Sequence, residues 1–207
     1  MKLLLTGFEP FGGHQINPSD VISQQLDRKT INNVKIVGKT IPLRYKEIRP
    51  IITELIEETN PEIIINMGQA PRSSIAFERV AVNLADVSKG AYNCGSIPDE
   101  EPLIEGGPVA YFSTLPLKKL VKYLTAKKIP CYVSNSAGTF GCNQIMYHTL
   151  NYLDIKSLND SIIAGFIHLP LLPEQTLNTP QSSSMSLNLM KKAIELVIEF
   201  LGKPMEG

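Results

Sequence analysis

Residues 134–143 read SNSAGTFGCN and join a predicted strand to a predicted helix. The strand is a short apolar run from Ile129 to Val133, which we expect to be buried. The helix covers Gln144 to Asp154, where apolar residues recur at helical spacing. Small residues at 136–138 allow a sharp turn between the two elements. Cys142 is therefore predicted to lie at or near the first turn of a helix.

That position favours a reactive thiol. Backbone N–H groups in the first turn lack intrahelical partners, and the helix dipole favours negative charge there. Such a setting lowers the pKa of a thiol from about 8.5 to between about 3.5 and 7.5, which predicts a thiolate at neutral pH. The same N–H groups are suited to binding an oxyanion. We interpret Cys142 as a candidate nucleophile, the alternative being a structural cysteine that caps the helix start.

Length and composition are those of a soluble globular protein, and we expect one domain over residues 1–207. Lys plus Arg equals Asp plus Glu, at 20 each, which gives no indication of a nucleic acid or an anionic membrane as partner. No segment approaches the ~20 apolar residues of a membrane span, and the N-terminal leucine run is too short for a signal peptide. Three well-separated cysteines form no disulfide framework, so we expect a reducing, cytoplasmic location.

Strands and helices alternate in the first seventy residues. The predicted strands are Lys2 to Thr6, Val34 to Ile41 and Glu62 to Met67, and the predicted helices are Pro18 to Leu26 and Tyr45 to Glu58. This alternation predicts an α/β fold with a right-handed, largely parallel, twisted sheet. Further along we expect an extended segment at 75–87, a long loop at 88–108, helices at 115–128 and 185–201, and a strand at 161–169.

The loop after the first strand, GFEPFGGH at residues 7–14, does not support nucleotide binding. It lacks the GxGxxG spacing, and Gly13 stands where a P-loop lysine would be. We interpret Phe8 and Phe11 as core residues on this evidence alone. Asn17 is predicted to cap the helix that begins at Pro18.

Three histidines could serve Cys142 as a base. Ligands of an open parallel sheet bind outside the carboxyl ends of its strands, and His168 ends a predicted strand at that edge. His148 lies on the same helix as Cys142, six residues and about 9 Å further along, and cannot reach it. His14, on the glycine-rich loop, stays an alternative base. Glu78 taken alone is typical of an exposed strand carboxylate, and no cluster has zinc-ligand spacing, so no metal is expected.

Two segments of the chain resemble the signatures of a known family. Gly68 to Pro71 with Ile75 to Asp86 resembles the glutamate signature of the pyroglutamyl peptidase type I (pyrrolidone-carboxylate peptidase) family, and Ser134 to Asn143 resembles its cysteine signature. Shorter matches follow in the same order at residues 6–13, 17–19, 107–108, 111–113 and 165–168. The resemblance covers nearly the whole chain.

The resemblance implies a three-layer α/β/α fold and a Cys142–His168–Glu78 triad. It implies a cysteine peptidase that removes an N-terminal pyroglutamyl residue from peptides through a thioester acyl-enzyme, with no metal or cofactor. It also implies a cytosolic protein, usually a homotetramer.

Further site residues are implied by the same resemblance. Gln69 matches a position from which a side chain can donate to the oxyanion. Phe8, Phe11 and Phe140 match positions that wall the family's lactam pocket, and Asn17 is included among the substrate-binding residues. An apolar pocket suits a neutral lactam, because a free α-ammonium would be desolvated there without a counter-charge.

Two departures from the family pattern lead to further expectations. Gly141 stands where a bulky aliphatic residue is usual, so we expect a less constrained pocket wall. Ser88 stands where the family has an arginine, so we expect that positive charge to be absent unless Lys89 replaces it. From these two departures we expect an activity lower than that of typical family members. The alternatives are a binding protein that kept the pocket with little turnover, and an amidohydrolase of another small lactam or amide.

Overall fold

In residues 1–87 and 90–203, which the computed structural model describes, seven strands form one mixed sheet of order β2-β3-β1-β4-β9-β5-β8. These strands are β1 (Lys2–Phe8), β2 (Thr30–Ile31), β3 (Val34–Ile41), β4 (Ile63–Gln69), β5 (Ile75–Glu78), β8 (Cys131–Ser134) and β9 (Ile163–Leu169). Strands β3, β1, β4 and β9 are parallel neighbours. A second, antiparallel sheet pairs β6 (Val80–Val82) with β7 (Ala110–Phe112).

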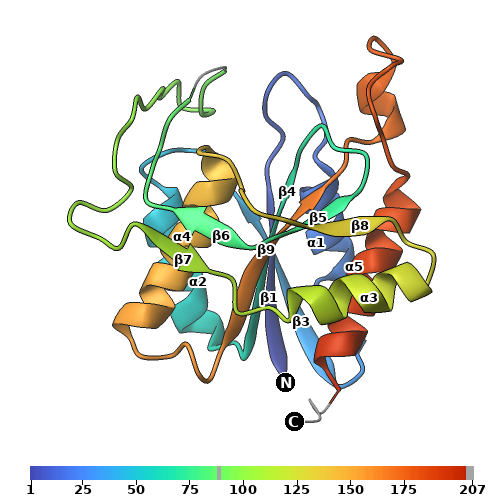
Figure 1. Ribbon diagram of the computed structural model, residues 1–207, viewed down its shortest axis with the longest axis horizontal. Coiled ribbons are helices and arrows are strands. Elements are labelled where there is room, and N and C mark those ends of the chain that lie inside the picture. Colours follow the sequence, from blue (N-terminus) through green and yellow to red (C-terminus); the bar gives the residue numbers. More distant parts are fainter. Residues whose placement is uncertain (88–89, 204–207) are drawn as a thin grey trace.

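Helices cover both faces of the main sheet (Figure 1). One layer holds α1 (Pro18–Leu26), α3 (Leu117–Ala126) and α5 (Leu187–Leu201), and the other holds α2 (Ile48–Thr59) and α4 (Gly141–Ile155). Each layer has its own core. Leu3 and Leu5 of β1 belong to the cluster under α1, α3 and α5, whereas Leu4 belongs to the cluster under α2 and α4. Burial on both faces explains the continuous apolar strands, and the predicted three-layer α/β fold is confirmed.

Most element boundaries follow the sequence signals. Helix α1 begins at Pro18 with Asn17 as its N-cap, whose side chain accepts a hydrogen bond from the Ser19 N–H at 3.0 Å. Strand β3 has its predicted bounds. Helix α2 begins at Ile48 rather than at Tyr45, because residues 45–47 form a turn.

The segment predicted as one extended run at 75–87 divides between the two sheets. Strand β5 ends at Glu78 and β6 begins at Val80, so the chain changes sheet at Arg79. The Arg79 N–H donates to the Ser134 carbonyl at 2.8 Å. Glu78 is thereby the last residue of a strand that lies inside the main sheet, and its side chain is fully buried. The reading of Glu78 as an exposed strand carboxylate is wrong.

The strand before the cysteine segment is not buried in the way its apolar sequence suggests. Strand β8 is the edge of the sheet, Tyr132 is 40% exposed and Cys131 is only partly buried. The main sheet is largely parallel, as expected, but β5 is antiparallel to β9 and parallel to β8. The carboxyl end of β8 therefore does not lie beside that of β9, and the turn at 135–140 brings the chain back to the start of α4.

Candidate active site

Cys142 is the second residue of α4 and is 6% exposed. Gly138 has a positive φ of 80°, a conformation that favours glycine, in the turn that precedes the helix. The Sγ atom lies over the backbone of Gly68, since a β-carbon there would be 2.7 Å from it. A side chain at residue 68 would therefore displace the thiol. The prediction that Cys142 lies in the first turn of a helix is confirmed.

His168 lies beside Gly68 in the parallel pairing of β4 with β9. Side chains of laterally paired residues point to the same face of a sheet, so the imidazole and the thiol share one face at one level of the sheet. The Phe166 ring packs against the imidazole with 4.8 Å between centroids. His168 is only 4% exposed. Gly68 therefore lies under the thiol of Cys142 and is the strand partner of His168.

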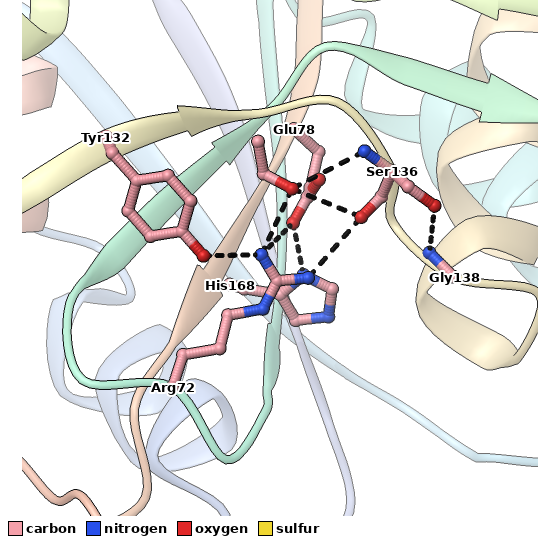
Figure 2. Close-up of polar contacts among 7 residues, drawn as sticks. Arg72, Glu78, Tyr132, Ser136, Gly138 and His168 are labelled. Carbon is pink, nitrogen blue, oxygen red and sulfur yellow. Dashed lines mark hydrogen bonds and ion pairs between the residues drawn. The ribbon is translucent and has the colours of Figure 1, made fainter.

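Glu78 fixes the orientation of the imidazole. Its Oε1 lies 2.7 Å from Nδ1 of His168, and Figure 2 shows the two side chains facing one another. With Nδ1 held by the carboxylate, Nε2 is the nitrogen left for a substrate or a thiol. His148, by contrast, lies with Nε2 at 3.5 Å from the amide nitrogen of Gln144 on its own helix. His14 is partly buried on the loop after β1.

Arg72 is the residue that sequence reasoning missed. Its Nη1 lies 3.1 Å from Oε1 of Glu78, and the arginine side chain is 24% exposed (Figure 2). Nη1 also donates to the Tyr132 hydroxyl at 2.9 Å and the Ser134 hydroxyl at 3.1 Å, and Nη2 donates to the Ser136 carbonyl at 3.4 Å. A forked cation held at several points is thereby fixed against a fully buried carboxylate.

Arg72 supplies a positive charge that the sequence analysis did not predict. A positive charge is present beside the candidate triad, although it comes from the turn after β4 and not from the loop where the family arginine stands. Ser88 and Lys89 lie outside the described residues, so the expectation that the charge of the family arginine is absent there stays a prediction. Arg72 therefore contributes positive potential beside the triad from the turn after β4.

The expected low pKa of the thiol is wrong. Burial, followed by the charge of Glu78, raises the pKa of Cys142 to about 12, and Arg72 and the backbone N–H only partly oppose these effects. Burial also lowers the pKa of His168, against the hydrogen bond and charge of Glu78. Desolvation of a charged thiolate outweighs the favourable helix terminus here. Both shifts favour the neutral forms of the thiol and the imidazole at neutral pH.

The three phenylalanines implicated by resemblance gather at the start of α4. Phe8 is fully buried and belongs to the same apolar cluster as Cys142. Phe140 is the N-cap residue of α4, and its ring centroid is 6.1 Å from that of Phe11. Aromatic rings therefore surround the N-terminal end of α4, the helix that carries the thiol.

Leu43 corrects the expectation of a less constrained pocket wall. A β-carbon at Gly141 would overlap Cδ1 of Leu43 and would lie 3.7 Å from the Phe8 ring. Leu43 is 1% exposed, so its side chain is confined there by packing. The volume that residue 141 lacks is filled from the segment after β3, and the wall is closed.

Gln69 and Asn17 have different surroundings. Oε1 of Gln69 accepts a hydrogen bond from Nε2 of Gln175 at 2.9 Å, which leaves its own amide N–H groups as donors. Gln175 also donates to the Ile16 carbonyl at 3.0 Å. Asn17 is 1% exposed, and its amide nitrogen donates to the Glu9 carbonyl at 3.2 Å. Asn17 therefore shapes the loop that carries Phe8 and Phe11.

Asn143, next to Cys142, ties the start of α4 to the small sheet. Its Oδ1 accepts from the Val82 N–H at 2.8 Å, and its Nδ2 donates to the carbonyls of Val82 and Leu84 at 2.9 and 3.0 Å. The residue is fully buried. The nucleophile segment is thus joined directly to the chain that continues from Glu78 through Arg79.

A buried cysteine at a helix start, on the same face as a histidine that a carboxylate orients, is an arrangement suited to acyl transfer by cysteine peptidases. Among the described residues, no three His, Cys, Asp or Glu side chains are grouped to hold a metal ion. No helix in the same residues has the length and apolar character to span a membrane.

Comparison with known proteins agrees with this class. The family model described as pyroglutamyl peptidase matches residues 1–203, and the chain belongs to that family. Pyrrolidone-carboxylate peptidase of Bacillus cereus strain Q1 is 45% identical over 198 residues, which cover 95% of this chain and 91% of the relative. The expected enzyme class, a pyroglutamyl peptidase of the cysteine type, is confirmed.

Solved structures show the same fold. Pyrrolidone carboxyl peptidase from Pyrococcus furiosus superimposes with a TM-score of 0.92 at 39% identity, covering 97% of each chain. The enzyme from Thermococcus litoralis gives a TM-score of 0.90 at 40% identity, covering 96% of this chain and 91% of that one.

Proposed function

We propose that the protein hydrolyses the bond after an N-terminal pyroglutamyl residue of peptides, with Cys142 as nucleophile, His168 as general base and acid, and Glu78 as the residue that orients His168. The observation that carries this proposal is the position of Gly68: its backbone lies under Sγ of Cys142 and beside His168, whose Nδ1 is held by Glu78.

The raised pKa of the thiol determines the order of proton movements. Nε2 of His168 takes the thiol proton as Sγ attacks the pyroglutamyl carbonyl carbon, because a free thiolate is scarce before the substrate arrives. The tetrahedral intermediate collapses when His168 gives that proton to the departing amine and the C–N bond breaks. A thioester remains on Cys142. Water, deprotonated by His168, then attacks the thioester and releases pyroglutamic acid and the thiol.

Charge that develops on the carbonyl oxygen needs donors. The first-turn N–H groups of α4 point towards its N-terminal side, and Gln69 offers its amide N–H groups because Gln175 occupies its oxygen. Glu78 stabilises the imidazolium form of His168 while the proton is held there. Arg72 contacts the same carboxylate oxygen, Oε1 of Glu78, that faces the imidazole, and so helps to keep Glu78 charged.

The apolar surroundings support a neutral ring as the substrate group. Phe8, Phe11 and Phe140 provide the walls, with Asn17 acting through the loop it anchors. Pyroglutamyl amides should be cleaved, whereas glutamyl, glutaminyl and prolyl amides carry a charged amine and should be very poor substrates. A site built to bind a polar group can discriminate against its absence by ~10⁴-fold or more.

A chromogenic pyroglutamyl amide tests the proposal, assayed with and without a thiol alkylator and a chelator. We expect cleavage that alkylation abolishes and the chelator leaves unchanged, and that Cys142→Ala abolishes while Cys94→Ala and Cys131→Ala do not. Tight binding of the amide without turnover would favour the binding protein. Comparable kcat/KM on prolyl or other amides would favour an amidohydrolase of different specificity.

We also propose a cytoplasmic location and a homo-oligomer, which the family resemblance implies is a tetramer. The thiols of Cys94, Cys131 and Cys142 are free, as a reducing compartment would keep them. Val109, directly before β7, and Phe112, at its end, are 84% and 69% exposed and offer apolar surface to a second copy. Sedimentation of the wild type and of Phe112→Ser tests the assembly, since a monomeric wild type would exclude it.

A further inference from the structure

Tyr92 is a buried tyrosine whose hydroxyl has no hydrogen-bond partner among the described residues. The residue is 2% exposed. It begins a tight turn in which its N–H donates to the Ser96 carbonyl at 3.0 Å and its carbonyl accepts from the Gly95 N–H at 2.7 Å. Buried tyrosine hydroxyls are usually paired, so this exception needs an explanation.

The ring of Tyr92 is part of the wall around the nucleophile. Its centroid lies 4.5 Å from that of Phe140, the residue two positions before Cys142, and 5.3 Å from that of Tyr45. Tyr92 also belongs to the buried cluster that includes Phe8 and Cys142. The ring is therefore held against the aromatic side chain that begins α4.

The turn that carries Tyr92 is anchored to the same wall. The Asn93 N–H donates to the Leu43 carbonyl at 2.8 Å, and the Asn93 amide donates to Oε1 of Glu9 at 2.7 Å and to the Pro10 carbonyl at 3.0 Å. Leu43 is the residue that fills the space beside Gly141. The hydroxyl thus belongs to a fixed part of the site.

The hydroxyl can only act as a neutral donor or acceptor. Burial raises the pKa of Tyr92, and the nearby charges of Tyr45 and Cys142 raise it further. A protonated phenol at this place offers one O–H to a group that enters the pocket.

We propose that Tyr92 is a specificity-determining residue that donates a hydrogen bond to the lactam carbonyl oxygen of the bound pyroglutamyl ring. The inference rests on the proposed function and deepens it. A lactam that enters an apolar pocket must find partners for its C=O and N–H, and the unpaired O–H of Tyr92 matches the carbonyl. The scissile carbonyl has other donors, namely Gln69 and the start of α4.

The test is Tyr92→Phe, which removes the hydroxyl and keeps the ring. We expect kcat/KM for a pyroglutamyl amide to fall at least tenfold, mainly through KM. The inhibition constant of L-pyroglutamate should rise by a similar factor, while that of cyclopentanecarboxylate, which has the ring without the lactam, should stay unchanged. The Tm should be equal to or higher than that of the wild type, because the lost hydroxyl was unpaired.

Tyr147→Phe is the matched control, since that buried hydroxyl donates to the Pro108 carbonyl at 2.7 Å. It should lower Tm and leave kcat/KM unchanged. Wild-type kinetics and inhibition in Tyr92→Phe would overturn the inference, as would a fall in Tm with equal weakening of both inhibitors. If the wild type cleaves no pyroglutamyl amide, the proposed function fails, and the dissociation constants of L-pyroglutamate and cyclopentanecarboxylate, measured by calorimetry, still test Tyr92.

Discussion

The side chain of Leu43 occupies the space that a β-carbon at Gly141 would need, so the residue before the candidate nucleophile can only be small while Leu43 is present. The two positions lie nearly 100 residues apart in the chain and share one volume. The pocket wall is therefore filled at this point, although the side chain that fills it comes from a different segment of the chain.

Gly141→Val should destabilise the protein by about 1–3 kcal/mol, because the added methyl groups overpack a confined site. Leu43→Ala alone should cost about 2–5 kcal/mol through the cavity it leaves. The double variant should be more stable than the sum of the two losses predicts. Urea unfolding and kcat/KM of all four proteins measure the coupling, and strictly additive losses would show that the two side chains do not share this space.

Arg72→Gln should reduce both stability and activity, because it leaves the fully buried Glu78 carboxylate without its cation. Breaking a buried pair in this way costs about 3–5 kcal/mol, and the partial exposure of Arg72 favours the lower end. Arg44→Gln is the control, since Arg44 and Glu47 form an exposed pair at 3.5 Å. Equal, small changes in Tm and kcat/KM for both variants would remove Arg72 from the site.

The acid limb of kcat/KM should lie below the ordinary histidine pKa of about 6.5, because burial lowers the pKa of His168 and only the neutral ring accepts a proton. Glu78 raises that pKa, so Glu78→Gln should move the acid limb to still lower pH while it reduces the maximum rate. His168→Ala should lose more rate than Glu78→Gln, with His14→Ala close to wild type. An acid limb that moves to higher pH in Glu78→Gln would contradict the assignment.

Alkylation of the free enzyme at pH 7–8 should modify Cys94 before Cys142. Cys94 is exposed and its hydrogen bonds with Ser96 lower its pKa, whereas burial raises the pKa of Cys142 to about 12. The rate at Cys142 should continue to rise with pH, because the thiolate fraction grows until the pKa is reached. Peptide mass spectrometry after timed iodoacetamide treatment, with Cys94→Ser as control, measures both. Preferential modification of Cys142 at pH 6 would instead indicate a preformed thiolate–imidazolium pair.

Local signals in the sequence predicted the elements well. Asn17 and Pro18 mark the start of α1, and the strand from Val34 to Ile41 is bounded as expected, because caps and apolar runs act over a few residues. The direction of the strands was harder to predict from the sequence. The antiparallel course of β5 beside β9 depends on how the chain leaves β4, which no periodicity records.

The site was predictable where residues match a known signature and less so where distant segments meet. Arg72 reaches the hydroxyls of Tyr132 and Ser134, 60 and 62 residues away, and nothing near Arg72 in the chain indicates those contacts. The pKa of Cys142 was mispredicted for a related reason. A helix start is a local feature, whereas the degree of burial results from the whole fold.

The hydrogen bonds of Asn143 with Val82 and Leu84 span 61 and 59 residues and also bear on how the protein is made. A chain still being synthesised contains β6 well before it contains the helix that holds it. Contacts of such sequence separation form late, because loop closure precedes any gain from them. Until residues 163–169 have followed and paired, the thiol of Cys142 is not yet shielded. The interval between the emergence of Cys142 and the pairing of β9 with β4 is therefore when this cysteine is most open to oxidation.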